Sequence, residues 1–127
     1  MVDQLYREII LDHNKNPRNK GILDPHDFSA EDVNPLCGDE IRIDLRVDDD
    51  RVSEIRFSGR GCAISQASAS LLTEMVEGMT LDEVKALTKD DLLEEIGIPL
   101  SPARLKCALL SLKVLKSGVY GVQQDDM

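Results

Sequence analysis

The feature that most constrains the fold is a change of hydrophobic period at Cys62. In residues 41–47, and again in 55–57, apolar side chains alternate with polar or charged ones. After Cys62 the apolar residues recur every three or four positions through residues 66–77. Alternation is typical of a strand with one buried face, and the longer spacing is typical of an amphipathic helix. The pattern therefore predicts a strand-to-helix junction at this cysteine.

The same signals divide the rest of the chain into short elements. Predicted strands lie at about 30–36, 41–48 and 51–58, the last two forming a hairpin around Asp48-Asp49-Asp50. Predicted helices lie at 2–13, about 66–77, about 81–87 and 102–117, with a further helical turn at about 89–95. Residues 17–30 are predicted as loop, and the tail from about 120 to 127 as disordered. Strands followed by helices indicate an α+β fold, with helices packed on one face of a small antiparallel sheet.

Length and charge limit the function. The 127 residues suit a single domain, 1–127. The formal net charge of −9 argues against nucleic acid and anionic membranes as partners, because both require clustered cations. The charge instead fits docking to a basic protein surface. A signal-peptide pattern and an apolar run of membrane-spanning length are both missing, so a cytoplasmic protein is expected.

Three cysteines suggest metal or redox chemistry. An odd number of thiols in a chain of cytoplasmic character makes a disulfide framework a poor explanation. Cys37 precedes the first long strand, Cys62 lies in the strand-to-helix junction, and Cys107 lies in the second turn of the last helix. Element ends meet at one edge of a layered domain, so the three thiols can converge into a thiolate metal site.

Asp39 is the candidate fourth ligand. It lies two residues after Cys37, across a glycine that lets the chain bend. An oxygen ligand beside three sulfurs favours ligand exchange over permanent structural zinc. The alternatives are a turn carboxylate at Asp39 and a small buried cysteine at Cys62. A Cys-x-x-Cys motif, which would indicate a zinc ribbon or a thioredoxin site, does not occur.

Other polar residues give weaker signals. His13 ends the first predicted helix and His26 lies in a loop, where a surface or capping role is favoured over metal ligation. Arg104 and Lys106 flank Cys107 near a helix start, where cations are slightly unfavourable. They are either solvated charges or cations that stabilise the thiolate of Cys107.

Several motifs in order resemble the iron–sulfur cluster assembly scaffold family, the group of IscU, SufU and the N-terminal domain of NifU. They are Leu5–His13, Asn16–Gly21, Asn34–Asp39, Gly59–Ser70 and Pro102–Cys107. The resemblance implies an α+β fold whose Cys37, Asp39, Cys62 and Cys107 hold a transient [2Fe–2S] cluster or a Zn²⁺ ion. It also implies a non-enzymatic protein that receives sulfur from a cysteine desulfurase and passes its cluster to apo iron–sulfur proteins.

The chain differs from both main branches of that family. Lys106 stands directly before the last cysteine, where the IscU branch has a histidine, and in this respect the chain resembles SufU. However, the insertion that the SufU branch carries between the second and third cysteines is missing. The IscU branch carries a chaperone-recognition motif, Leu-Pro-Pro-Val-Lys. The corresponding segment here is Leu100-Ser101-Pro102-Ala103-Arg104, so recognition by a dedicated Hsp70 is doubtful. By resemblance the sulfur acceptor is Cys107 in a cluster scaffold and Cys37 in a zinc-dependent sulfur acceptor. A small domain with structural zinc is the third alternative.

Overall fold

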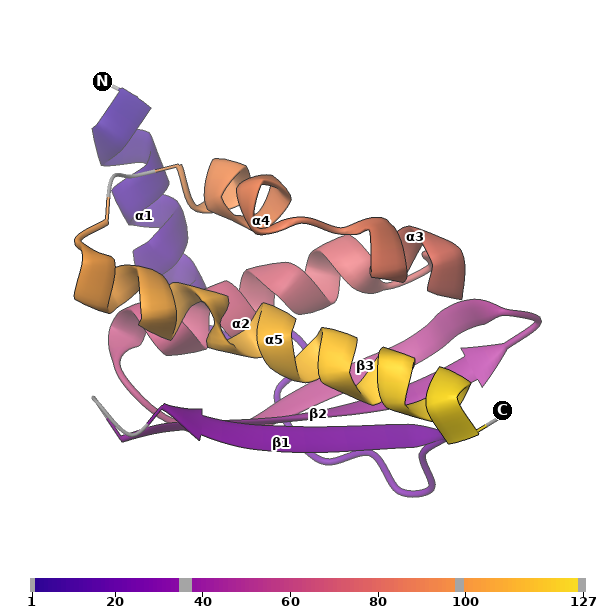
Figure 1. Ribbon diagram of the computed structural model, residues 1–127. Coiled ribbons are helices and arrows are strands. Elements are labelled where there is room, and N and C mark those ends of the chain that lie inside the picture. Colours follow the sequence, from indigo (N-terminus) through magenta and orange to yellow (C-terminus); the bar gives the residue numbers. More distant parts are fainter. Residues whose placement is uncertain (1, 35–37, 98–99, 126–127) are drawn as a thin grey trace.

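A three-stranded antiparallel sheet forms one layer of the protein and helices form the other. The computed structural model describes residues 2–34, 38–97 and 100–125. The strands are β1 (Phe28–Asn34), β2 (Asp39–Asp48) and β3 (Arg51–Arg60), in the spatial order β1-β2-β3. The helices are α1 (Val2–Lys15), α2 (Ala63–Val76), α3 (Leu81–Ala86), α4 (Lys89–Ile96) and α5 (Pro102–Asp125). The helices lie on one face of the sheet (Figure 1), which confirms the predicted α+β class.

The core lies between the sheet and helices α2 and α5. Ile41, Ile43 and Leu45 of β2 are at most 2% exposed, and Ile55 and Phe57 of β3 are fully buried. These are the alternating residues of the sequence, so the predicted hairpin is confirmed.

The edge strand β1 begins earlier than expected. Phe28 and Ala30 pack against the core and pair with Leu45 and Ile43 of β2. The prediction of loop up to residue 30 was therefore wrong at its end. The polar residues of this strand hide the alternation, because its outward-facing positions are exposed at a sheet edge. Residues 35–36 of the predicted strand lie outside the described residues.

Capping explains how three helices begin. α2 starts at Ala63, earlier than predicted, because Cys62 itself is the N-cap residue. The predicted capping box of Thr80 and Glu83 is confirmed at the start of α3. α4 opens with a second capping box, formed by Thr88 and Asp91.

Helix α5 continues past its predicted end at Gly118. A glycine inside a helix costs only about 1 kcal/mol, and the buried Val119 beyond it offsets that cost. Gly118 also lets α5 approach β1, since an added Cβ would lie 3.2 Å from the Cβ of Ala30. The helix thus includes residues 120–125 of the segment expected to be disordered. In the described part of the chain, no helix has the length and apolar character needed to cross a membrane.

Residues 19–27 cover part of the other face of the sheet and one of its edges. The peptide groups of Asn19 and Gly21 exchange hydrogen bonds with Phe57, along the outer edge of β3. Asp44, fully buried on the outer face, accepts hydrogen bonds from Leu23 N, Ser29 Oγ and Arg42 Nε. Burial alone would raise the pKa of Asp44, but these hydrogen bonds outweigh it and the pKa is lowered. A charged carboxylate therefore holds this segment on the sheet.

His13 joins α1 to α2 and is not the surface residue that the sequence suggested. It is 5% exposed, with Nδ1 2.7 Å from Ser70 Oγ and Nε2 3.3 Å from Glu74 Oε1. Ser70 Oγ already accepts the Arg18 N–H, so its own proton can go to Nδ1. The neutral imidazole with its proton on Nε2 fits this network, and burial, aided by the charge of Arg18, lowers the pKa of His13.

We predict that the α1–α2 contact weakens in mild acid. Because the folded-state pKa of His13 is lowered, its contribution to stability is present above about pH 6.5 and is lost as the pH falls below that value. Urea unfolding at pH 7.5 and 5.5 should show a smaller loss of stability in His13→Gln than in the unchanged protein. His26→Gln, in an exposed loop, is the control and should retain the full pH dependence. An unchanged pH dependence in His13→Gln would contradict this assignment.

Candidate metal centre

Cys62 is held at the N-terminus of α2 with its thiol open to solvent. Its backbone is extended, with φ −69° and ψ 167°, and its Sγ accepts the Ser65 N–H at 3.4 Å. The sulfur thus takes the place of the usual capping oxygen at the positive end of the helix. The thiolate of a cysteine is the form that binds metals and accepts sulfur. The residue is exposed, which rules out the alternative of a small buried cysteine.

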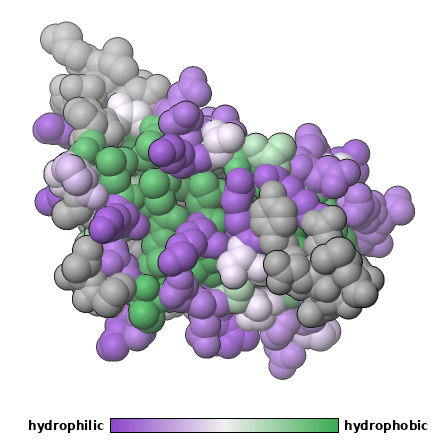
Figure 2. Space-filling view, in the orientation of Figure 1, coloured by the Kyte–Doolittle hydropathy of each residue, from purple (hydrophilic) through white to green (hydrophobic). Residues whose placement is uncertain are grey.

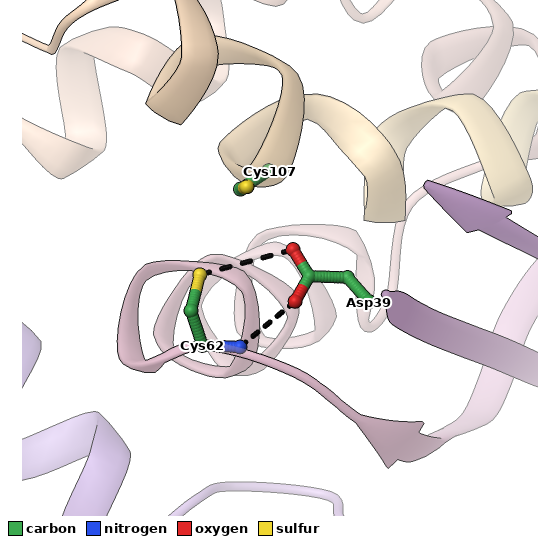
Figure 3. A group of neighbouring side chains, drawn as sticks. All are labelled: Asp39, Cys62 and Cys107. Atoms are coloured by element: carbon green, nitrogen blue, oxygen red, sulfur yellow. Dashed lines mark hydrogen bonds between the residues drawn. The ribbon is translucent and has the colours of Figure 1, made fainter. Parts of the chain in front are cut away.

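Asp39 lies beside Cys62 and is almost completely buried. The first residue of β2, it is 1% exposed. Its Oδ1 accepts the Cys62 N–H at 2.8 Å, and its Oδ2 lies 3.8 Å from Cys62 Sγ. One oxygen is therefore engaged with the backbone while the other faces the sulfur (Figure 3).

Two glycines give this carboxylate its space. A Cβ on Gly61 would lie 2.5 Å from Asp39 Oδ1, inside contact distance. A Cβ on Gly59 would lie 2.0 Å from the carbonyl oxygen of Glu40, and Gly59 has φ +122°. The glycines that the sequence placed before Cys62 thus allow β3 to pass close to the start of β2.

Cys107 faces the same point from α5. It is 6% exposed, and the side-chain amide of Asn34 lies 4.0 Å from its sulfur. Asn34 is the last residue of β1 and pairs directly with Asp39. An amide N–H near a sulfur can stabilise negative charge on it, and hydrogen bonds to sulfur tune iron–sulfur centres.

The three side chains form one group. The donor atoms of Asp39, Cys62 and Cys107 all lie within 4.8 Å of one another, and Figure 3 shows them converging from β2, α2 and α5. Ligands of a tetrahedral zinc ion lie roughly 3.3–3.8 Å apart, given bonds of about 2.0–2.3 Å. The 3.8 Å between Cys62 Sγ and Asp39 Oδ2 matches that separation. Two thiol sulfurs and one carboxylate oxygen therefore fit a thiophilic metal.

Not every predicted site residue can be placed. Cys37, the remaining predicted ligand, lies outside the described residues. Neither His13 nor His26 belongs to the group that could hold a metal; His26 Nδ1 instead lies 2.9 Å from the Leu23 carbonyl oxygen. Arg104 and Lys106 are exposed on α5.

Two features of the site had no role in the sequence analysis. Asn34 lies beside the sulfur of Cys107, and the Cys62 peptide N–H orients Asp39. Asn34 was visible in the Asn34–Asp39 motif, but its position depends on the pairing of β1 with β2. The hydrogen bond from the Cys62 N–H does not depend on side-chain type, so only Gly59 and Gly61 hint at it in the sequence.

The sequence comparisons agree with this site. The chain matches the family described as NifU-like N terminal domain over residues 5–126. It belongs to this family. It is 41% identical to the zinc-dependent sulfurtransferase SufU of Bacillus subtilis (strain 168), over 93% of this chain and 91% of SufU. It is 36% identical to the iron-sulfur cluster assembly scaffold protein IscU of Escherichia coli (strain K12), over 90% of this chain and 91% of IscU. The SufU alignment spans 136 residues, more than the 127 of this chain, so SufU carries residues that this chain lacks.

Solved structures share the fold. The crystal structure of FiSufU from Fervidobacterium islandicum AW-1, a protein of the SUF system, superposes with a TM-score of 0.77 at 27% identity. The superposition covers 94% of this chain and 99% of FiSufU. The N-terminal NifU-like protein of Brucella abortus has a TM-score of 0.77 at 24% identity, over 97% of both chains, and supports the fold alone.

We predict that Gly61→Ala weakens metal binding without unfolding the protein. The new Cβ would push the Asp39 carboxylate off the Cys62 N–H, and loss of such an orienting contact typically costs about 10–100-fold in metal affinity. Competition titrations with Zn²⁺ and a chromophoric chelator measure the effect. Gly78→Ala, where an added Cβ meets nothing within 4 Å, is the control; because Gly78 has φ +88°, that variant adds backbone strain but no contact with Asp39. Equal zinc affinities of the two variants would contradict the role assigned to Gly61.

Proposed function

We propose that this protein is an iron–sulfur cluster assembly scaffold. It would build a transient [2Fe–2S] cluster on Cys62, Cys107, Asp39 and Cys37, using sulfur from a cysteine desulfurase, and pass the cluster to apo-proteins. The observation that carries the proposal is the convergence of Asp39, Cys62 and Cys107 donors within 4.8 Å at an accessible point of the surface. Membership of the NifU-like family and the similarity to IscU support it.

The Asp39 carboxylate suits a site that must release its iron–sulfur cluster. Its Oδ1 accepts the Cys62 N–H, and its Oδ2 lies 3.8 Å from Cys62 Sγ, so Oδ2 is the oxygen directed at the neighbouring sulfur. A hard oxygen donor binds a thiophilic metal less firmly than a thiolate does. The exposure of Cys62 gives an incoming sulfur donor, or an accepting thiol, direct access to the site. Assembly and release at one place are chemically consistent with this donor set.

A zinc-dependent sulfur acceptor is the second candidate. Three observations favour it: the 41% identity to SufU, the presence of Lys106 instead of a histidine before Cys107, and a donor separation that suits one metal ion. Bound Zn²⁺ would keep the cysteines as thiolates and shield them from oxidation. A ligand exchange with a cysteine desulfurase would then expose one thiolate to attack the persulfide.

We predict that the protein takes up an iron–sulfur cluster under anaerobic conditions. Incubation with ferrous iron, cysteine and a cysteine desulfurase should produce visible thiolate-to-iron charge-transfer absorption, strongly reduced in Cys62→Ser and Cys107→Ser. Ser68→Ala, within α2 but away from the donor group, is the control for handling losses. If the protein retained zinc and showed no visible absorption, the scaffold proposal would be contradicted.

We predict that Asp39→Ala lengthens the lifetime of that cluster. The substitution removes the exchangeable oxygen ligand, while the orphaned Cys62 N–H costs only about 1–3 kcal/mol of stability. The decay of the visible absorption with a chelator measures the lifetime, and circular dichroism checks the fold. Asp48→Ala, in an exposed position of the β2–β3 hairpin, is the control. Faster cluster loss in Asp39→Ala than in Asp48→Ala would contradict the labile-ligand role.

Sulfur acceptance separates the two candidates. If the protein is a zinc-dependent acceptor, the zinc-loaded form should strongly stimulate desulfurase turnover, and Cys37→Ala should abolish the stimulation. Persulfide trapping by mass spectrometry identifies the acceptor. Sulfur found on Cys107 of the unchanged protein, with turnover preserved in Cys37→Ala, would favour the cluster scaffold instead.

A further inference from the structure

An apolar groove lies between α5 and the free edge of the sheet. It has a volume of about 400 Å³ and is lined by Val33 and Asn34 of β1 and by Leu105, Lys106, Leu109, Leu110 and Lys113 of α5. Val33 is 50% exposed, which is unusual for a large apolar side chain. Figure 2 shows apolar side chains gathered on this face over the N-terminal half of α5.

The groove reflects an unexpected orientation of α5. In the sequence, Leu105, Leu109, Leu112 and Leu115 form the longest apolar stripe of this helix, and Cys107, Leu110 and Val114 form a second stripe, offset around the axis. In the structure Leu110 and Val114 of the second stripe are at most 4% exposed, whereas Leu105 and Leu109 are only partly buried. The first half of the longest leucine stripe is thus left incompletely covered by this chain.

The groove runs along an open strand edge. Successive residues of a strand face opposite sides, so the contribution of both Val33 and Asn34 means that the groove crosses the edge of β1. Among the described strands only β2 pairs with β1. On that edge the Val33 N–H donates to Asp32 Oδ1 at 2.8 Å, and none of the described strands pairs with it there. By alternation, the backbone groups of Ser29 and Glu31 also face outward.

Charge indicates what chemistry fits there. The chain as a whole carries −9, yet the charged residues of α5 before Asp125 are all basic: Arg104, Lys106, Lys113 and Lys116. Lys106 and Lys113 stand at either end of the groove, about 10 Å apart along the helix. Lys113 is 71% exposed and contacts Asp32 Oδ2 at 3.0 Å, an exposed ion pair that a partner carboxylate can replace at little cost.

We propose that this groove docks an extended, acidic segment of a partner protein, which adds as a fourth strand to β1. The partner backbone would take the outward-facing groups of Ser29, Glu31 and Val33, as in β-strand addition. On the side facing α5, an apolar side chain would lie against Leu105 and Leu109. Acidic residues two positions to either side would reach Lys106 and Lys113, because i−2 and i+2 of a strand lie about 13 Å apart.

A second copy of this chain fits the groove poorly. Antiparallel pairing of two β1 strands would bring Glu31 and Asp32 of both copies to one new seam, and like charges across strands are destabilising. Two domains of −9 would also repel each other over the rest of their surfaces. A separate acidic segment whose outward-facing residues are uncharged avoids the repulsion with Glu31, and its inward-facing carboxylate competes with Asp32 for Lys113.

The probe is the peptide acetyl-Thr-Asp-Thr-Leu-Thr-Asp-Thr-amide. Its palindromic order allows either strand direction, with leucine and both aspartates on one side. Titration into the full ¹⁵N-labelled chain should give saturable amide shifts confined to Ser29–Asn34 and residues 105–113. The shifts should be the same with and without Zn²⁺, so this result is independent of the proposed function. No saturable shifts on β1 at millimolar peptide would overturn the proposal, as would equal self-association shifts without peptide.

Three controls test the parts of the proposal separately. Replacing both aspartates of the peptide with lysine should abolish saturable binding, and N-methylating its central leucine should weaken binding about fivefold if an edge hydrogen bond is lost. Lys113→Ala in the protein should raise the Kd roughly threefold, while Lys116→Ala on the same helix should leave it unchanged. Binding that tolerates both peptide changes would exclude strand addition with charge recognition.

Discussion

The hydrogen bond from the Cys62 N–H to Asp39 Oδ1 is the contact on which the site depends. It joins the first residue of β2 to the N-cap of α2 across 23 positions of the chain. The same contact directs the other carboxylate oxygen at Cys62 Sγ and requires a glycine at position 61. This one backbone donor thus orients the Asp39 carboxylate, places it beside Cys62 Sγ, and requires glycine at position 61.

The three candidate ligands differ in burial. Asp39 and Cys107 are almost wholly enclosed, whereas Cys62 is exposed. The enclosed pair is held by surrounding structure, since Asp39 is fixed by the Cys62 peptide and Cys107 lies beside Asn34. The exposed thiol remains the point where chemistry can enter. This division suits the scaffold function proposed above, in which a cluster is held and then released.

The sequence predicted most of the sheet and the helical layer, and the reasons for its failures are physical. Alternation located β2 and β3 because their inward residues are fully buried, but it missed the start of β1, whose outward face is exposed. Gly118 was read as a helix end, although buried Val119 carries α5 onward. The structure brings Asp39, Cys62 and Cys107 together, and their positions at or near element ends are what suggested this from the sequence. The position of Asn34 depends on strand register, and that of His13 depends on the packing of α1 against α2. The metal-binding role of the group, and the single-domain assignment, remain predictions.

The segment containing Asn19 and Gly21 pairs with Phe57, and Gly78 and Met79 pair with Val52, along the outer edge of β3. The described sheet therefore offers a long free edge only at β1. Open-ended growth by edge-to-edge strand pairing requires two unpaired strand edges on every copy. A protein with one such edge can form at most a closed pair through its strands, and growth stops there. The short N-terminal segment between α1 and β1 therefore protects a domain with an accessible edge from polymerising into fibres.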